Sequence, residues 1–212
     1  MHDSRSALIR QLQAWNIQQP ALLDVISTID RKRFLPDEKH FLADKDVFIK
    51  LECGYSMVPI HFTAKHLNAI DLSSINDVLC VGSGCGFELT LLAMLGVNVM
   101  VAEPNTKLHQ SLQDILSPNV LKHIQWTDID AHKMPIEDKL FDLIWYQGAI
   151  NSIPQHHSLH AQPTAKLLAM LGKTKDLHQA AVVSVTNDNI MTLFDASFPH
   201  YPHLDQKDVF TF

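Results

Sequence analysis

Basic residues are scarce in this chain. It has 17 Lys and Arg residues against 23 Asp and Glu residues in 212 positions, which gives a formal net charge of -6 at pH 7. A surface that binds nucleic acid needs concentrated positive charge, and the single cluster Arg31-Lys32-Arg33 is too short to provide it. We therefore expect no nucleic-acid partner.

Long apolar runs and cysteines are also few. No apolar run is long enough to cross a bilayer, and the sequence does not open with the charged and then apolar segments of a signal peptide. We therefore expect a cytoplasmic protein with no membrane partner.

Cys53, Cys80 and Cys85 cannot all pair within one chain, so reduced thiols are expected in place of disulfides. The histidine cluster within 156–160 lacks any zinc-type spacing. It predicts a solvated polar loop or helix start and no metal site.

Glycine is rare as well, yet three of the seven glycines lie at alternate positions, Gly82, Gly84 and Gly86. The apolar run 78–81 before them is short, partly β-branched and preceded by polar residues, as in a buried parallel strand. Glycines remove Cβ atoms where the backbone must turn sharply and lie against a ligand. The apolar segment 87–95 has helical spacing, so the sequence predicts a strand, a tight turn and a helix whose N–H groups face a ligand.

A second strand is predicted at 97–102, and Glu103 follows it, where a carboxylate can accept hydrogen bonds from ribose hydroxyls. Dinucleotide folds place their third glycine one position later, in G-x-G-x-x-G, where this chain has Phe87. The tighter G-x-G-x-G spacing favours S-adenosylmethionine over a nicotinamide cofactor. The residues predicted to hold it are Gly82, Ser83, Gly84, Gly86 and Glu103.

Strands and helices alternate along the rest of the chain. Strands are predicted at 78–81, 98–102, 123–127, 141–146 and 180–185, helices at 87–95, 106–116 and 159–171, and sheet-edge segments around 191–194 and 209–212. This order predicts an α/β fold, a Rossmann-like, doubly wound, mostly parallel sheet. Helices at 4–15 and from Pro20 onward form an N-terminal addition. We expect one domain, with a helical cap and substrate loop at 1–60 and a cofactor-binding core at 61–212.

Two further residues are expected near the turn, because ligands of such sheets lie beyond the carboxyl ends of the strands. Asp128 follows the third strand and is placed to accept a hydrogen bond from an adenine amino group, although it can equally cap a helix or turn. Gln147 follows the fourth strand and is assigned to the same cofactor crevice.

With these motifs in place, the chain resembles the protein-L-isoaspartate O-methyltransferase family almost end to end. Residues 30–36, DRKRFLP, resemble the family's R-x-x-F-x-P signature, and residues 78–87 are similar to its VLEIGTGSGY. Residues 141–144, FDLI, match its F-D-x-I strand, and residues 209–212 resemble the last strand of a short bacterial branch. The resemblance implies an S-adenosylmethionine-dependent O-methyltransferase acting on a protein or peptide carboxylate.

The sequence departs from the family pattern at several places, and two of these concern the cofactor turn and the substrate loop. Cys80 stands where the family usually has an acidic residue. The family's substrate loop reads G-x-T-x-S-x-P, and its hydroxyls hold the substrate carboxylate, whereas residues 54–60 here read GYSMVPI. Ser56 keeps one hydroxyl and is the catalytic candidate, while Val58 and Ile60 replace the serine and the proline.

These departures leave two hypotheses for function. The leading one is a methyltransferase whose acceptor is a carboxylate or a small molecule; a carboxylate is ionised at neutral pH and needs no base. An alcohol or amine would need one, and His61 is nearest in sequence. The alternative is a noncatalytic or weakly active homologue that binds the cofactor, or nothing, and serves as an interaction or regulatory module. The sequence does not determine the oligomeric state.

Overall fold

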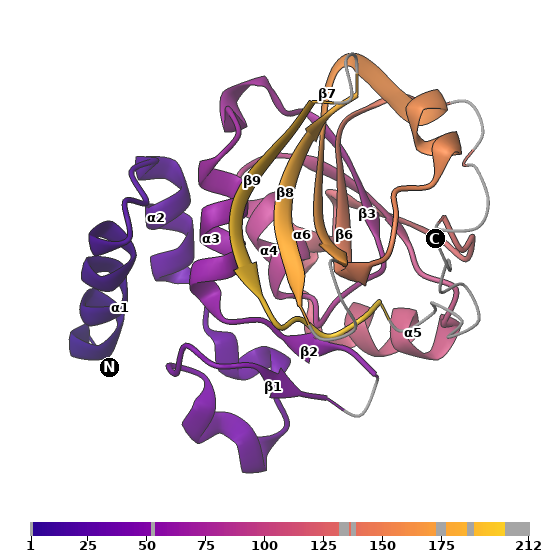
Figure 1. Cartoon of the computed structure of the whole chain (residues 1–212). Coiled ribbons are helices and arrows are strands. Elements are labelled where there is room, and N and C mark those ends of the chain that lie inside the picture. Colours follow the sequence, from indigo (N-terminus) through magenta and orange to yellow (C-terminus); the bar gives the residue numbers. More distant parts are fainter. Residues whose placement is uncertain are drawn as a thin grey trace.

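The computed structural model describes residues 2–51, 54–131, 136, 139–172, 177–185 and 189–201. Its centre is a seven-stranded sheet in the order β5-β4-β3-β6-β7-β8-β9 (Figure 1). The strands are β3 (Asp77–Val81), β4 (Asn98–Ala102), β5 (Ile124–Thr127), β6 (Phe141–Ile150), β7 (Ala161–Gly172), β8 (His178–Ser184) and β9 (Asn189–Ala196). The pairs from β5 through β7 are parallel, whereas β7-β8 and β8-β9 are antiparallel. The predicted mostly parallel α/β sheet is confirmed.

Helices pack against both the parallel and the antiparallel strands of the sheet. They are α3 (Ile60–Asn68), α4 (Phe87–Met94), α5 (Thr106–Ile115) and α6 (Pro118–Leu121), with a short 3-10 helix η3 (Leu72–Ser74) before β3. Every side chain of α4 from Phe87 to Ala93 is buried, because this helix packs between the sheet and its neighbours. Burial on all sides is typical of a helix in such a central position.

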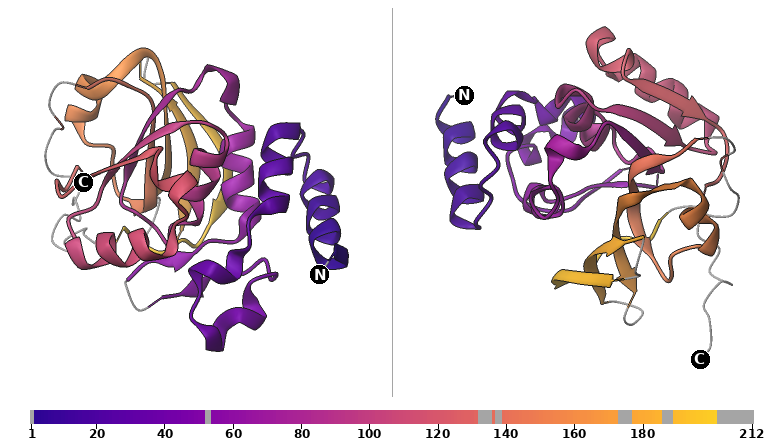
Figure 2. Two further views of the ribbon diagram at one scale, coloured as in Figure 1. Left: turned by 180° about the vertical axis from the view of Figure 1, so that it is seen from behind. Right: turned by 90° about the horizontal axis from the view of Figure 1, so that it is seen from above.

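The N-terminal part packs against one side of this core. The helices α1 (His2–Ala14) and α2 (Pro20–Thr28) lie beyond α3, and α1 is the outermost element in all views (Figure 2). A small lobe follows, made of the 3-10 helices η1 (Arg31–Phe34) and η2 (Asp37–Leu42) and the two-stranded sheet of β1 (Ile49–Lys50) and β2 (Ser56–Met57). One cluster of buried apolar side chains extends from Leu12 to Tyr201.

The helix predicted at 159–171 is wrong. The structure has the 3-10 helix η4 (Gln155–His160) and then the long strand β7, which pairs with β6 on one side and β8 on the other. Burial on both faces produces a nearly continuous apolar run, which a periodicity argument does not separate from a buried helix. The predicted edge segment at 191–194 lies within β9, and the one at 209–212 lies outside the described residues.

The prediction of a solvated histidine segment is also wrong. His157 and His160 are 2% and 6% exposed, respectively. The His157 ring hydrogen-bonds the Tyr146 hydroxyl through Nδ1 and contacts the Ala131 carbonyl oxygen through Nε2 at 2.6 Å. Within the described residues, no group of three or more His, Cys, Asp or Glu side chains is arranged to hold a metal ion. In that same part of the chain, no helix combines the length and apolarity that a membrane span requires.

Candidate functional site

The glycine turn has the predicted geometry. Gly82, Gly84 and Gly86 have φ values of 89°, 57° and 90°, a left-handed region that side chains other than glycine rarely adopt. The Gly82 N–H donates to the Ala102 carbonyl at 2.9 Å, which joins the end of β3 to β4. Gly86 is the residue immediately before α4. The turn therefore lies at the carboxyl end of the central strand, as predicted.

Glu103 lies directly against this turn and is fully buried. Its Oε2 accepts hydrogen bonds from the Ser83 N–H at 3.1 Å and the Ser83 hydroxyl at 2.8 Å, and its Oε1 accepts one from the Asn105 N–H at 3.0 Å. The structure thus brings together the carboxylate and the turn residue that the sequence assigned to one ligand. The backbone donors also offset much of the cost of burying the carboxylate.

A second buried carboxylate, Glu88 on α4, supports the turn from within the core. It accepts a hydrogen bond from the Thr63 hydroxyl at 3.0 Å, and the Cys85 Sγ lies 3.9 Å from its Oε2. Burial raises the pKa of Glu88, although the Thr63 hydrogen bond and the Arg31 charge oppose that shift. Arg31 itself donates to the Ala43 and Val58 carbonyls, each at 3.0 Å. The Arg31 guanidinium also stands 5.5 Å from the centroid of the Phe87 ring, so this arginine links the N-terminal lobe to the helix that follows the turn.

The remaining predicted residues divide into two groups. Ser56 on β2 and Gln147 on β6 line one small cavity, so the structure brings the catalytic candidate and one cofactor candidate together. A Cβ placed on Gly84 would stand 2.9 Å from the Gln147 Oε1, so Gln147 also contacts the turn. Asp128 follows β5 and is exposed, and its carboxylate makes no hydrogen bond within the described residues. Its role as an adenine acceptor stays a prediction.

Two tyrosines that the sequence analysis did not select also lie in the site. The Tyr55 hydroxyl donates to Glu103 Oε2 at 3.0 Å, and the Tyr201 ring packs against Gly82. Burial raises the pKa of Tyr55 well above its usual value, and Tyr201 and Glu103 add to that shift. The phenol is therefore a hydrogen-bond donor at neutral pH. The only available signal was the position of Tyr55 beside Ser56 in the substrate loop.

The residue types thus fit an adenosyl ligand, while two side chains of the chain occupy the space beside Gly82 in this structure. The glycine turn presents backbone atoms without side chains to a ligand, and Glu103 is a carboxylate of the kind that accepts hydrogen bonds from ribose hydroxyls. A Cβ placed on Gly82 would nevertheless stand 2.4 Å from the Tyr55 hydroxyl oxygen and 2.7 Å from the Tyr201 ring. The side chains of this chain fill the position next to the turn.

Comparison with known proteins gives consistent matches. The family model described as protein-L-isoaspartate (D-aspartate) O-methyltransferase matches residues 3–196. A protein-L-isoaspartate O-methyltransferase of Methylorubrum extorquens is 27% identical over 171 residues, which are 80% of this chain and 75% of the relative. One from Aliivibrio fischeri is 25% identical over 174 residues, covering 82% and 84% of the two chains.

A solved structure shares the fold. It is a Plasmodium falciparum protein described as a protein-L-isoaspartate O-methyltransferase in complex with S-adenosyl-L-homocysteine. It superposes with a TM-score of 0.77 at 16% identity, over 92% of this chain and 96% of that one. At this identity the likeness concerns the architecture, including the N-terminal helices and the mixed sheet.

Proposed function

The chain belongs to the protein-L-isoaspartate O-methyltransferase family of S-adenosylmethionine-dependent enzymes, and from that premise we propose that it transfers a methyl group to a carboxylate of a protein or peptide. The observation that carries this proposal is the buried Glu103, hydrogen-bonded to Ser83 of the glycine turn. A carboxylate after the second strand is the group that would accept hydrogen bonds from the ribose hydroxyls of an adenosyl ligand.

In this proposal the chain positions its ligands and performs no acid-base step. When bound, S-adenosylmethionine supplies a methyl group on a cationic sulfonium, which needs no further activation. Gly82, Gly84 and Gly86 would face it with backbone, Glu103 and Asp128 would hold its ribose and adenine, and Gln147 would border it. A carboxylate acceptor is already ionised at neutral pH, so alignment and exclusion of water carry the catalysis.

Ser56 is proposed to hold the acceptor carboxylate. Ser56 lines the same small cavity as Gln147, so a bound acceptor group would lie between the substrate loop and β6. His61 is not needed for this chemistry. Its Nδ1 lies 2.5 Å from the Asp46 carboxylate, and its ring packs 4.4 Å from that of Trp15, at the boundary with α1.

The test is transfer of a labelled methyl group to an isoaspartyl peptide, read as a base-labile methyl ester. We expect transfer by the wild type, and Ser56→Ala to lower kcat/KM about tenfold while leaving S-adenosylhomocysteine affinity unchanged. The matched control is Ser111→Ala on α5, whose exposed hydroxyl bonds only its own helix backbone at Lys107. No ester on the peptide, despite cofactor binding, would contradict isoaspartate as the acceptor.

A second candidate function has its own support. A homologue that does not use the cofactor would have no need of an open site, and here Tyr55 and Tyr201 fill the space beside Gly82. Calorimetric titration with S-adenosylhomocysteine separates the two candidates. Micromolar binding supports the methyltransferase, whereas no binding up to millimolar concentration, by the wild type or by variants with the tyrosines removed, supports the noncatalytic homologue.

A further inference from the structure

The carboxylate of Glu103 is satisfied by this chain alone. Tyr55 and Ser83 together donate three hydrogen bonds to Oε2, and the Asn105 N–H donates to Oε1. Of these donors, only the Tyr55 hydroxyl comes from outside the parallel sheet and its turns. It therefore makes the kind of contact that a sugar hydroxyl would otherwise make.

Tyr201 completes this cover over the turn. Its side chain is 1% exposed, and its ring meets that of Tyr55 edge to face with centroids 6.4 Å apart. Both side chains reach the position where a Cβ of Gly82 would be. The two tyrosines are far apart in the sequence, and both side chains lie against the backbone of Gly82.

The backbone at Tyr201 is held by a specific pairing. The Ala149 N–H donates to the Pro199 carbonyl and the Tyr201 N–H donates to the Ala149 carbonyl, both at 2.9 Å, so residues 199–201 extend the sheet beside the end of β6. The pairing requires Gly148, because a Cβ there would stand 2.6 Å from the Tyr201 Cα. The absence of a side chain at 148 lets the segment approach.

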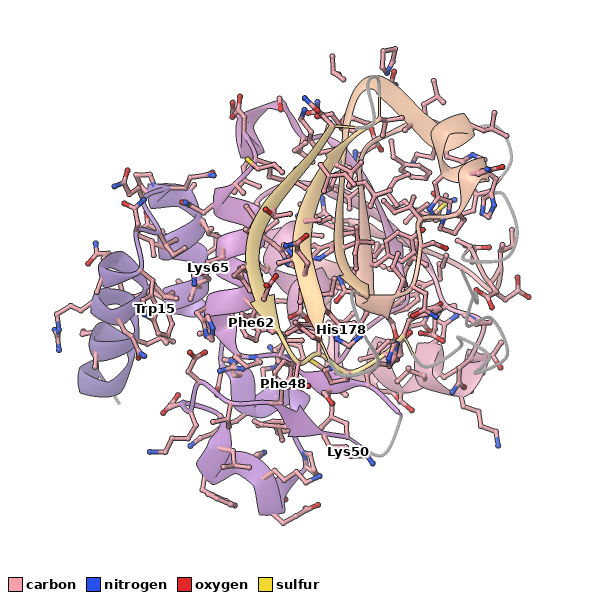
Figure 3. The ribbon with its side chains drawn as sticks, viewed as in Figure 1. Trp15, Phe48, Lys50, Phe62, Lys65 and His178 are labelled. Atoms are coloured by element: carbon pink, nitrogen blue, oxygen red, sulfur yellow. The ribbon has the colours of Figure 1, made fainter. Side chains whose placement is uncertain are left out.

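An aromatic cluster anchors the residue at the start of this segment. The Phe198 ring contacts Phe48 edge to face with centroids 5.2 Å apart and lies 6.2 Å from Phe62. The Phe198 N–H donates to His178 Nδ1 at 3.2 Å. Phe48, Phe62 and His178 lie near one another around the lower edge of β8 and β9, where β8 begins at His178 (Figure 3). The segment 198–201 is thus bound at both its ends.

We propose that Tyr55 and Tyr201 form an internal plug of the adenosyl site, and that the cofactor binds only after both side chains withdraw. This inference rests on the proposed function, because it assumes that the site takes an adenosyl ligand. Closed and open states then compete, and the measured dissociation constant equals the intrinsic one divided by the open fraction. Weakening the plug tightens binding without adding any contact to the ligand.

The experiment is calorimetric titration of the full chain with S-adenosylhomocysteine. We expect Tyr201→Ala to bind at least tenfold tighter than the wild type. Tyr55→Phe keeps the ring and removes only the hydroxyl on Glu103, so it folds even if Tyr201→Ala does not, and we expect it to bind several-fold tighter. The matched control is Tyr146→Phe, which removes a buried hydroxyl that bonds His157 instead of Glu103; its affinity should match that of the wild type.

Three results have distinct meanings. Tighter binding by the plug variants than by the wild type and the control supports the plug. Equal binding by all four proteins overturns the plug and leaves the proposed function intact. No binding by any of them, up to millimolar ligand, overturns the proposed function and the plug with it.

Discussion

At the scale of single residues, His66 on α3 makes the fold sensitive to acid. Its side chain is 4% exposed, and its Nε2 has no hydrogen-bond partner among the described residues. Burial lowers its pKa from 6.5 to about 4. Because the unfolded chain takes up this proton first, stability is complete above pH 6.5 and falls as the pH drops toward 4, by about 3 kcal/mol in total from this group.

The measurement is urea unfolding of the wild type and His66→Phe between pH 7.5 and 4. The phenylalanine keeps an aromatic ring beside Trp145 and Phe194 and cannot be protonated. We expect the variant to lose less stability than the wild type across this interval. An identical pH dependence for the two proteins would show that His66 does not contribute.

Val58 is the residue at which acceptor specificity is expected to change. It borders the same cavity as Ser56, so a hydroxyl at position 58 would face the proposed acceptor site. We expect Val58→Ser to raise methyl transfer to an isoaspartyl peptide several-fold, measured as base-labile label. The control is Val47→Ser, because Val47 is 45% exposed and is not among the residues that line this cavity. Equal rates for the wild type and Val58→Ser would contradict the alignment of the loop with the family's serine position.

Position 60 is left unchanged in this experiment, because the Ile60 side chain is fully buried and its replacement by proline would remove core contacts.

The residues that could be predicted are those whose role follows from local backbone chemistry. Three alternate glycines and an acidic residue after the next strand were enough to place Gly82 and Glu103 together. Tyr55 and Tyr201 could not be predicted, because nothing local to either tyrosine indicates a partner that far away in the sequence. Their contact forms only when the substrate loop and the segment after β9 meet at the sheet.

At the scale of elements, β6 and the segment 199–201 depend on Gly148. A methyl group at this position would overlap the Tyr201 backbone, so we expect Gly148→Ala to cost about 1–3 kcal/mol of stability and to detach the segment. Hydrogen exchange should then accelerate at the Tyr201 and Ala149 amides, the donors of the two pairing hydrogen bonds. Gly96→Ala is a control for adding a methyl group, since no atom lies within 4 Å of a Cβ there, although its positive φ adds strain. Unchanged exchange at the two amides of Gly148→Ala would contradict the pairing.

The elements that were predicted correctly are those with one buried face or a short apolar run between turns. β7 was not, because Ala, Leu and Lys favour a helix and the run is apolar on both sides. Pro163 within it was the contrary signal. Proline is tolerated at irregular points of a sheet, and the pairing of β6 with β7 shifts register between Phe141 and Leu143, close to it.

At the scale of the whole molecule, an adenosyl ligand should stabilise the fold. Binding to the native state alone adds about 2.7 kcal/mol at 100 times the dissociation constant, and for a domain of this size about 1 kcal/mol raises Tm by roughly 2–4 °C. We therefore expect S-adenosylhomocysteine at that excess to raise Tm by about 5–10 °C. NAD at the same concentration is the control and should have no effect. A shift with NAD instead would favour the dinucleotide alternative.

The burial of the thiol in the glycine turn determines how fast that thiol reacts with external reagents. Cys85 lies between Gly84 and Gly86 and is 4% exposed, and burial raises the pKa of the neighbouring Cys80 thiol on β3. An alkylating reagent reaches such sulfur atoms only during transient local openings. The modification rate of Cys85, followed by mass spectrometry of its peptide, therefore reports how often the turn becomes accessible, and it does so in the wild-type sequence with no cofactor present.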